Sequence, residues 1–488
     1  MKTIISTAMP RVLALAGAAA LLTTAAQAQD KLTEEDLLDL SDGQKQALEN
    51  SASRLSDEAI GLQYDDMPER PQPLFEAGNP FMGFGAFADN LNVPGGGVFQ
   101  PSTLIWGRYR TAYQGSGGSN AAGEVSEWVN RLDLFAETRL SGTERVIVGL
   151  RPLDEEGEFS GYDFREGEWT DGTGGDLIQV AFLEGDLGEI LADADRDDSL
   201  PLDIGFAVGR QPIFFQDGVL INDVMDSVGV TKNSLRFWGF SNIRLTGLAA
   251  WNEVHRGTGV LDKDAFLVGF LAEADNENAT MELDFVATNS EAGGDGLYAG
   301  FGSTQRIGGV NTTFRANGSM AGDAADGSIN PVFVDDGVLV TAEVSITPYK
   351  TNDVMYWNTY AGFGAFRSAA RGPATGTPLN RIGITYSATG IGSLIAPLGG
   401  QPDDSVGTAV GYQKIFAGGR QQLIYEAGAR QTFDGGGALA GGVRYQRAFG
   451  QHTVFIVDLF AAADGRSLAE GGQDGNYVAG RFELLFKF

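Results

Sequence analysis

Apolar and polar residues alternate along most of this chain, from about residue 103 to the last residue. The alternation runs in segments of about ten residues, which glycine, aspartate, asparagine and serine separate. In the segment 279–288, Leu283 and Phe285 share one face, and Glu282 and Asp284 share the other. Successive side chains of a strand point to opposite faces, so this period of two predicts β-strands.

The length and the polar faces of these segments indicate a membrane barrel rather than a soluble β-sandwich. Strands of about ten residues can cross a bilayer at a tilt, whereas strands of soluble proteins are usually about 5–6 residues long. The polar faces carry charges of both signs, as the wall of a water-filled lumen would. We therefore expect an all-β fold, a transmembrane antiparallel up-and-down β-barrel over residues 101–488.

The last segment adds a more specific signal. Residues 477–488 form an alternating aromatic strand that ends on Phe488. This ending resembles the assembly signal of Gram-negative outer-membrane β-barrel proteins of porin type. The resemblance implies that Phe488 is an assembly signal for the barrel-assembly machinery. It also implies an outer-membrane location, among lipid and lipopolysaccharide.

Counting strands leaves one ambiguity. Strand starts fall near residues 103, 128, 145, 176, 201, 234, 243, 264, 279, 296, 310, 336, 353, 380, 405, 421, 439, 451 and 478. That is an odd number, but bacterial single-chain barrels have even numbers of strands. Short turns belong on the periplasmic side of such barrels. Counting strands forward from residue 103 and backward from Phe488 assigns the turns to sides that conflict between Arg367 and Ser405. Either 391–397 is a further strand or a neighbouring strand is false. We expect about 18 strands, with 16 and 20 as alternatives.

The region before the barrel has two parts. Residues 1–28 have the positive start, apolar stretch and Ala-Gln-Ala cleavage site of a secretory signal peptide, which predicts export. Residues 29–100 then form an N-terminal periplasmic extension or a plug. Its first part, 31–62, has the leucine spacing of short amphipathic helices, and the Pro/Gly-rich segment 65–101 disfavours long regular elements.

Composition excludes several classes of function. The chain has no cysteine, 2 histidines, and 34 Lys+Arg against 64 Asp+Glu, for a formal charge of −30. No disulfide framework or thiolate chemistry is therefore possible, and nucleic-acid binding is disfavoured because phosphate contacts need Lys and Arg. Neither His255 nor His452 has a diagnostic serine context. We expect no enzyme activity and no cofactor other than a possible calcium ion.

One acidic stretch defines that calcium candidate. Asp193, Asp195 and Asp197 alternate as in the first half of a calcium loop. The second half departs from the pattern, because Asp198 replaces the glycine and Ile204 replaces the final glutamate. A solvated acidic turn is the alternative.

The long loops are acidic as well. Residues 154–176 contain nine Asp/Glu and one Arg. They are either solvated surface or a mouth that attracts cations. Acidic loops could also bridge to lipopolysaccharide through divalent ions.

A loop folded into the lumen is predicted at 206–230. There a strand delivers Gly-Arg-Gln and a long segment with several aspartates follows. The region resembles one in alginate-export-like barrels, and this resemblance implies that Arg210 and Asp217 lie near the constriction. An ordinary extracellular loop is the alternative.

Alternation also places charged residues on the inner wall of the barrel. The candidates for the pore lining, besides Arg210 and Asp217, are Arg131, Asp133, Arg139, Arg244, Glu282, Asp284, Arg381 and Arg481. Arginines opposite carboxylates would create a transverse field that orients polar solutes. The alternative is cross-strand salt bridges that stiffen the wall, and both can hold. Aromatic residues such as Trp106 and Trp128 cluster at strand ends, as interfacial girdles do, although an inner sugar track is also compatible.

These features together predict a porin-like channel for passive diffusion of small hydrophilic solutes, cation-preferring at its acidic mouth. Two alternatives stay open: an export conduit for an acidic polysaccharide, and a structural or adhesive outer-membrane barrel. A homo-oligomer is also possible.

Overall fold

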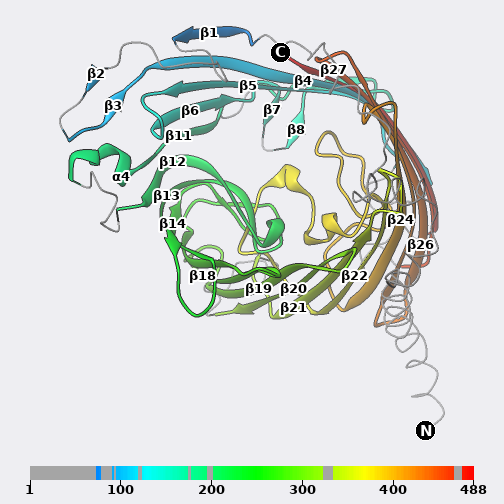
Figure 1. The fold of residues 1–488 in the computed structure, drawn as a ribbon. Helices are drawn as coiled ribbons and strands as arrows, with labels where there is room; N and C mark the ends of the chain where they lie inside the picture. The colour runs from blue at the N-terminus through cyan, green and yellow to red at the C-terminus, as the bar shows by residue number, and fades with distance from the viewer. Residues whose placement is uncertain are drawn as a thin grey trace, which may run out of the picture.

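Figure 1 shows the computed structural model of the protein, a curved sheet closed into a barrel with chain segments folded inside it. The structure describes residues 73–78, 91–92, 95–118, 124–155, 157–173, 177–194, 202–322, 333–466 and 475–488. The predicted signal peptide and the predicted helices of 31–62 lie outside these residues. In the part of the chain that is described, no helix has the length and apolar character needed to cross a membrane.

Eighteen antiparallel strands form the wall, and the last of them pairs with the first. In chain order they are β4 (Ser102–Gly118), β5 (Ser126–Arg139), β6 (Arg145–Leu150), β11 (Ile178–Asp186), β12 (Ile204–Phe215), β13 (Ile221–Leu235), β14 (Asn242–Trp251), β17 (Phe266–Asp275), β18 (Ala279–Asn289), β19 (Gly296–Ile307), β20 (Val310–Ala321), β21 (Gly337–Ile346), β22 (Val354–Gly364), β24 (Ser405–Phe416), β25 (Gln421–Thr432), β26 (Gly437–Phe449), β27 (Thr453–Asp464) and β28 (Gly475–Lys487). The all-β barrel fold and the count of eighteen strands are confirmed.

The two faces of the wall differ as the alternation predicted. On β18, Leu283 and Phe285 are 47% and 49% exposed, whereas Asp284 between them is 2% exposed. On β28, Phe482 is 51% exposed and its neighbour Arg481 is 3% exposed. Apolar side chains therefore cover the outside of the barrel, and charged side chains lie inside it.

The connections also separate by length. Five short connections all fall at one end of the barrel, called the turn end here, together with Phe488. They are residues 140–144, 236–241, 347–353, 417–420 and 450–452. The longest connections, 151–177 and 365–404, lie at the opposite end, the loop end.

The strand predicted near residue 380 is wrong. β22 pairs directly with β24, so residues 365–404 contribute no strand to the wall. The apolar positions of 381–388 alternate for a different reason, because Ile382, Ile384 and Tyr386 are buried inside the barrel at 0%, 7% and 1% exposure. Residues 391–397 are likewise not a strand.

The start predicted for the strand at 234 is also wrong. β13 begins at Ile221 and pairs with β12 along its length, from Phe215↔Ile221 to Ile204↔Lys232. Residues 206–230 are therefore mostly wall, and only the turn between β12 and β13 enters the lumen. The apolar and polar alternation that predicts a strand is weak at the start of β13, because Asp223, Met225 and Ser227, on one face of this strand, are all buried against protein.

The described parts of the region before the barrel lie at the turn end. β1 (Phe75–Gly78) pairs with the start of β4, from Phe75↔Ile105 to Gly78↔Ser102. β28 leaves this part of β4 without a partner, because its last pair is Lys487↔Arg108. β1 thus covers an edge that would otherwise expose unpaired backbone groups. β2 (Leu91–Asn92) and β3 (Val98–Phe99) form a separate small hairpin.

Candidate functional site

Two segments fold into the lumen and narrow it. The first is the hairpin tip, residues 216–220, which contains the 3₁₀ turn η3 (Gln216–Gly218) between β12 and β13. The second is the inner loop, residues 365–404, between β22 and β24. Figure 1 draws the inner loop in yellow inside the ring, with the green hairpin of β12 and β13 curling toward it.

The hairpin tip and the inner loop are bonded to each other. β23 (Ala370–Arg371) in the inner loop pairs in parallel with the start of β13. The N–H of Ala369 donates to the carbonyl of Leu220 at 2.9 Å, and the N–H of Gly372 donates to the carbonyl of Asn222 at 2.9 Å. The two segments are thus one backbone-bonded unit within the lumen.

Arg371 reinforces this unit. Its side chain is 2% exposed and donates to the carbonyl of Gly218, to Ser368 Oγ at 3.1 Å and to the carbonyl of Gly376 at 3.3 Å. Burial lowers the pKa of Arg371 to about 10, and the nearby carboxylate of Asp223 opposes that decrease. Arg371 therefore keeps its positive charge at neutral pH.

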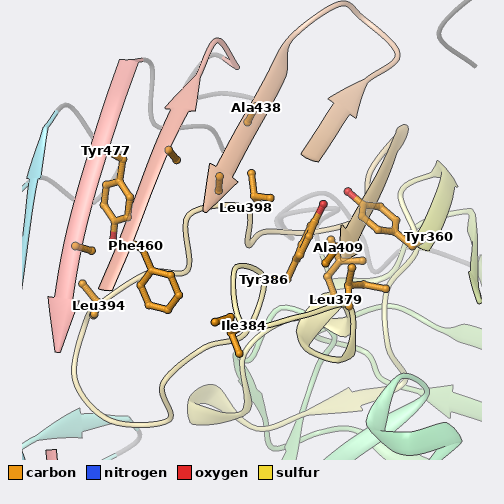
Figure 2. Close-up of a cluster of buried hydrophobic side chains, with 14 of the residues drawn as sticks. Tyr360, Leu379, Ile384, Tyr386, Leu394, Leu398, Ala409, Ala438, Phe460 and Tyr477 are labelled. Atoms are coloured by element: carbon orange, nitrogen blue, oxygen red, sulfur yellow. The ribbon is translucent and has the colours of Figure 1, made fainter. Parts of the chain in front are cut away.

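The inner loop is held against the wall by apolar packing, which Figure 2 shows. Side chains of the loop contact the inner faces of β22 and β24–β28. The loop side chains are Phe366, Leu379, Ile382, Ile384, Tyr386, Leu394 and Leu398, and the wall side chains include Tyr360, Ala409, Ala438, Phe460 and Tyr477. Each large apolar side chain removed from water contributes about 1.5–3 kcal/mol. The loop is therefore a packed part of the barrel.

Glycines in the wall make room for this loop. A Cβ at Gly428 would lie 2.6 Å from Thr385 Oγ1 and 2.7 Å from Leu398 Cδ1. A Cβ at Gly407 would lie 2.4 Å from the Tyr386 hydroxyl. Any larger residue at these two positions would displace the loop toward the lumen.

Polar anchors complete the attachment. Glu426 of β25 is 6% exposed and accepts hydrogen bonds from the N–H of Ile384 at 2.9 Å, the N–H of Thr385 at 2.7 Å and the hydroxyl of Tyr356. Arg430, four residues further along β25 on the same face, donates to the carbonyl of Gly399 at 2.9 Å. Charged groups of the wall thus satisfy backbone groups of the loop.

Arginines dominate one side of the lumen, called the arginine wall here. Six arginines, Arg108, Arg110, Arg131, Arg151, Arg444 and Arg481, share four carboxylates, Asp133, Asp154, Asp458 and Glu483. Most of these residues lie on β26, β27, β28, β4 and β5, which are consecutive in the ring. The ion pairs form two clusters, one around Asp133 and one around Asp458 and Glu483. With six arginines against four carboxylates, this wall carries more positive than negative charge.

The contacts of the arginine wall are short. Arg444 and Arg481 approach Asp458 at 2.6 and 2.5 Å, and Arg110 approaches Glu483 at 2.6 Å. Arg110 and Arg131 also donate to the carbonyl of Gly390 in the inner loop, at 3.1 and 3.0 Å. The arginine wall therefore also positions the inner loop.

Carboxylates dominate the other side, called the acidic wall here. Five carboxylates, Asp217, Glu273, Glu282, Asp284 and Glu343, lie with three arginines, Arg244, Arg315 and Arg381. Asp217 of the hairpin tip pairs with Arg315 of β20 and lies 3.3 Å from Arg381 of the inner loop. Gln216 Nε2 donates to Asp284 Oδ2 at 2.7 Å. The tip is thus seated on β18–β20.

The two charged walls face each other across the ring. In Figure 1, β4 and β5 lie at the top of the barrel and β18–β21 at the bottom. A cavity of about 480 Å³ lies between the arginine wall and the parts of β12 and β13 next to the hairpin tip. Its charged lining residues are Arg131, Arg151, Arg210, Lys263, Asp154, Glu155, Asp223 and Glu253. A smaller cavity of about 200 Å³ lies on the acidic side of the tip, against Glu273 and Glu282. The larger cavity thus has charges of both signs in its lining, whereas the lining of the smaller cavity is mainly acidic.

The structure brings most predicted pore-lining residues to these two walls. Arg131, Asp133 and Arg481 lie in the arginine wall, and Asp217, Arg244, Glu282, Asp284 and Arg381 lie in the acidic wall. Arg210 lines the larger cavity and pairs with Glu253 at 2.8 Å. Arg139 is near the turn end, where it pairs with Glu137 at 2.8 Å. Arg381 reaches the lumen from the inner loop rather than from a strand.

The remaining predicted sites lie elsewhere. Asp193 is exposed in the short turn η2 (Ala192–Ala194), and Asp195 and Asp197 lie outside the described residues. Among the residues that the structure describes, no group of three or more His, Asp or Glu side chains could hold a metal ion. His255 Nδ1 lies 2.9 Å from Asp223 Oδ1, and His452 Nδ1 lies 2.8 Å from the carbonyl of Lys487.

The sequence alone does not reveal the inner loop or its anchors. Glu426, Arg371 and Arg430 bind backbone groups of a loop that the alternation predicts partly as a strand. One signal was available in the sequence. Alanines at 409, 438, 440, 462 and 479 occupy inward-facing positions where a water-filled lumen would favour polar residues, and all five are buried. A run of small apolar residues on the inner face indicates that protein covers that part of the wall.

Comparisons with known proteins agree with this architecture. The structure is similar to that of OprD from Pseudomonas aeruginosa, with 11% sequence identity, 79% of this chain and 95% of that chain covered, and a TM-score of 0.50. It is also similar to the outer membrane protein OpdK from Pseudomonas aeruginosa, with 12% identity, coverage of 79% and 98%, and a TM-score of 0.50. No protein-family model and no curated protein matches the sequence. The similarity at this identity establishes a shared fold.

Proposed function

We propose that this protein is an outer-membrane channel for passive diffusion of small hydrophilic solutes. The observation that carries the proposal is the closed barrel with an apolar exterior and two opposed charged walls around a constricted lumen. A soluble barrel would gain nothing from exposing large apolar side chains all around its outside. A membrane barrel needs such a surface and can keep a polar interior.

The opposed walls support selection by orientation. A polar solute that passes the hairpin tip experiences a positive potential on one side and a negative potential on the other. A solute with separated positive and negative groups can align with this field. The charged side chains of the two walls then replace the water molecules that such a solute loses. An apolar solute of the same size would lose water without that compensation.

A preference for cations at the mouth remains part of the proposal. The connection 151–177 at the loop end is acidic, and within its described residues Glu166 and Glu168 are exposed. Carboxylates at the entrance raise the local concentration of cations before they reach the constriction. Because these groups are exposed, the effect should weaken as ionic strength rises.

Planar-bilayer recording of the purified protein tests the proposal. We expect discrete channels and, in a potassium chloride gradient, a reversal potential that reports cation preference. Replacing both Glu166 and Glu168 with glutamine should reduce this preference at low salt. Glu189→Gln, an exposed change near the turn end, is the matched control and should leave it unchanged. A folded protein that produces no channels would overturn the proposal.

Export of an acidic polysaccharide is a second candidate, which the arginine wall favours. Six arginines against four carboxylates could form a positive track for a polyanion. If this candidate holds, acidic oligosaccharides added on the turn side should block the current, and neutral oligosaccharides of equal length should not. Equal effects of the two sugars would favour diffusion of small solutes.

A further inference from the structure

The strands of the barrel wall are short in one sector. β6 has 6 residues and β11 has 9, whereas their neighbours β5 and β12 have 14 and 12. β6 pairs only with the part of β5 from Leu134 to Arg139. Nearer the loop end, β5 pairs instead with β9 (Gly161–Asp163), from Glu127↔Asp163 to Val129↔Gly161. Part of the outer connection therefore continues the wall where β6 stops.

β9 and β10 (Glu168–Thr170) form a small hairpin with two different faces. Tyr162 pairs with Trp169, and Asp163 pairs with Glu168. Tyr162 is also the register partner of Trp128 on β5, and Trp128 belongs to the outward face of that strand because Val129 and Arg131 point inward. Tyr162 and Trp169 therefore face outward, and the two carboxylates face the other way. The hairpin repeats the apolar-out, charged-in pattern of the barrel wall.

The outward face carries a cluster of five aromatic residues, called the aromatic patch here: Tyr113, Trp128, Tyr162, Phe164 and Trp169. Their rings touch edge to face, with centroids 5.8 Å apart for Trp128 and Trp169 and 5.6 Å apart for Tyr113 and Phe164. Trp169 is 70% exposed, Phe164 52% and Tyr113 50%. Rings so exposed and so close together form one continuous apolar surface.

The patch continues an aromatic outer surface of the neighbouring strands. On β4, Arg108, Arg110 and Gln114 face the lumen, so Tyr109 and Tyr113, at the alternate positions, face outward. Tyr109 stacks there on Phe486 of β28, with ring centroids 6.2 Å apart. Aromatic residues at the borders of the apolar band are typical of outer-membrane barrels.

The turn of the hairpin has the opposite character. Arg165 and Glu166 are exposed charged residues at the turn, and Asp163 Oδ1 accepts hydrogen bonds from both of their N–H groups, at 2.7 and 3.1 Å. Charged groups thus lie directly beyond the aromatic rings. Tryptophan and tyrosine favour the boundary between water and the apolar interior of a bilayer, because they combine an apolar ring with a polar group.

We propose that the aromatic patch is a lipid-contacting surface, and that the β9–β10 hairpin completes the barrel wall in the outer leaflet with its charged turn in water. The proposal rests on the proposed function, because it requires the barrel to span a membrane. It assigns to part of the long acidic connection a second role, to close the sector of short strands against lipid. The occupant of the patch is a bilayer, and a second copy of the chain is the competing occupant.

The absence of cysteine from the sequence allows a clean test by single-cysteine spin labelling. Nitroxide labels would be placed separately on F164C, W169C, E166C and L283C, and each protein reconstituted into phosphatidylcholine–phosphatidylglycerol vesicles. Leu283 on the outside of β18 is the control for a lipid-facing wall position, and Glu166 is the control for water. The measurement compares collision with oxygen, which concentrates in lipid, and with a water-soluble nickel complex.

We expect labels at 164 and 169 to favour oxygen as the label at 283 does, and the label at 166 to favour nickel. If 164 and 169 follow 166 while 283 still favours oxygen, the barrel spans the membrane but the hairpin proposal is wrong. If 283 also favours nickel, the proposed function fails and this proposal fails with it. Low collision rates with both reagents at 164 and 169, together with spin–spin broadening between copies, would assign the patch to a subunit interface and overturn the lipid assignment.

Discussion

Gly428 and Glu426 lie two residues apart on β25, and both face the inner loop. One provides space and the other provides a charge that accepts hydrogen bonds from the loop backbone. The alternation of the strand correctly predicts that both point inward. It does not predict what covers them, because a glycine or a glutamate on the inner face is equally compatible with water. Only the partners of these residues, which lie thirty to forty-three positions earlier in the chain, distinguish an inner face packed against protein from one in contact with water.

Gly428→Leu tests the packed face at the residue scale. The new side chain would overlap Thr385 and Leu398, so the inner loop should move toward the lumen and lower the single-channel conductance. Gly441→Leu on β26 is the matched control, because a Cβ there has only one backbone atom near it, at 3.8 Å, and the residue is on the exposed outer face. Equal conductance of the two variants in bilayers would contradict this account of the wall glycines.

The hairpin tip and the inner loop show the limits of strand prediction at the element scale. The period of two locates the wall strands, because the outer and inner faces of the wall have opposite polarities. It failed at 381–388, where buried apolar residues alternate without pairing into a sheet. It also failed at the start of β13, where protein covers the inner face and removes the polarity difference. Both errors fall on the two segments that narrow the lumen. Protein covers these segments where the rest of the wall contacts solvent, so their alternate positions do not differ in polarity.

Arg371→Ala tests the bond between these two segments. Removal of the guanidinium leaves the carbonyl of Gly218 without this donor, at a cost of about 1–3 kcal/mol for each buried group left unpaired. We expect the tip and the loop to separate more often, which should give larger and noisier single-channel currents. Arg420→Ala, an exposed change at the turn end, should leave the currents as in the unmodified protein. Quiet, unchanged currents in the Arg371 variant would show that backbone pairing alone holds the unit.

At the scale of the whole molecule, closure of the barrel supplies rigidity without cysteine. The sequence predicts the closed form from its strand count and from the aromatic C-terminal strand. It does not predict that the basic and acidic walls lie on opposite sides. That arrangement depends on the order of strands around the ring, and each strand alone shows only that its charges point inward.

The predicted assembly role of Phe488 belongs to the same scale. Its N–H donates to the carbonyl of Gly107 at 3.0 Å, and its carbonyl accepts from the N–H of Gly107 at 2.7 Å, so the last residue helps to join the last strand to the first. Deletion of Phe488 should reduce the yield of folded barrel several-fold, and the molecules that do fold should conduct normally. Heat-dependent migration on gels measures the folded fraction. Lys487→Ala, which keeps the backbone bonds of that residue, is the control, and the idea fails if both variants fold equally well.

The pairing of β28 with β4 also fixes an order of events. Gly118 pairs with Tyr477, so the first wall strand waits for a partner that is translated 359 residues later. Until β28 is in place, a folded β4 has an open strand edge that could pair with other chains. A chain that lacks β28 never acquires this pairing, so its barrel keeps that open edge.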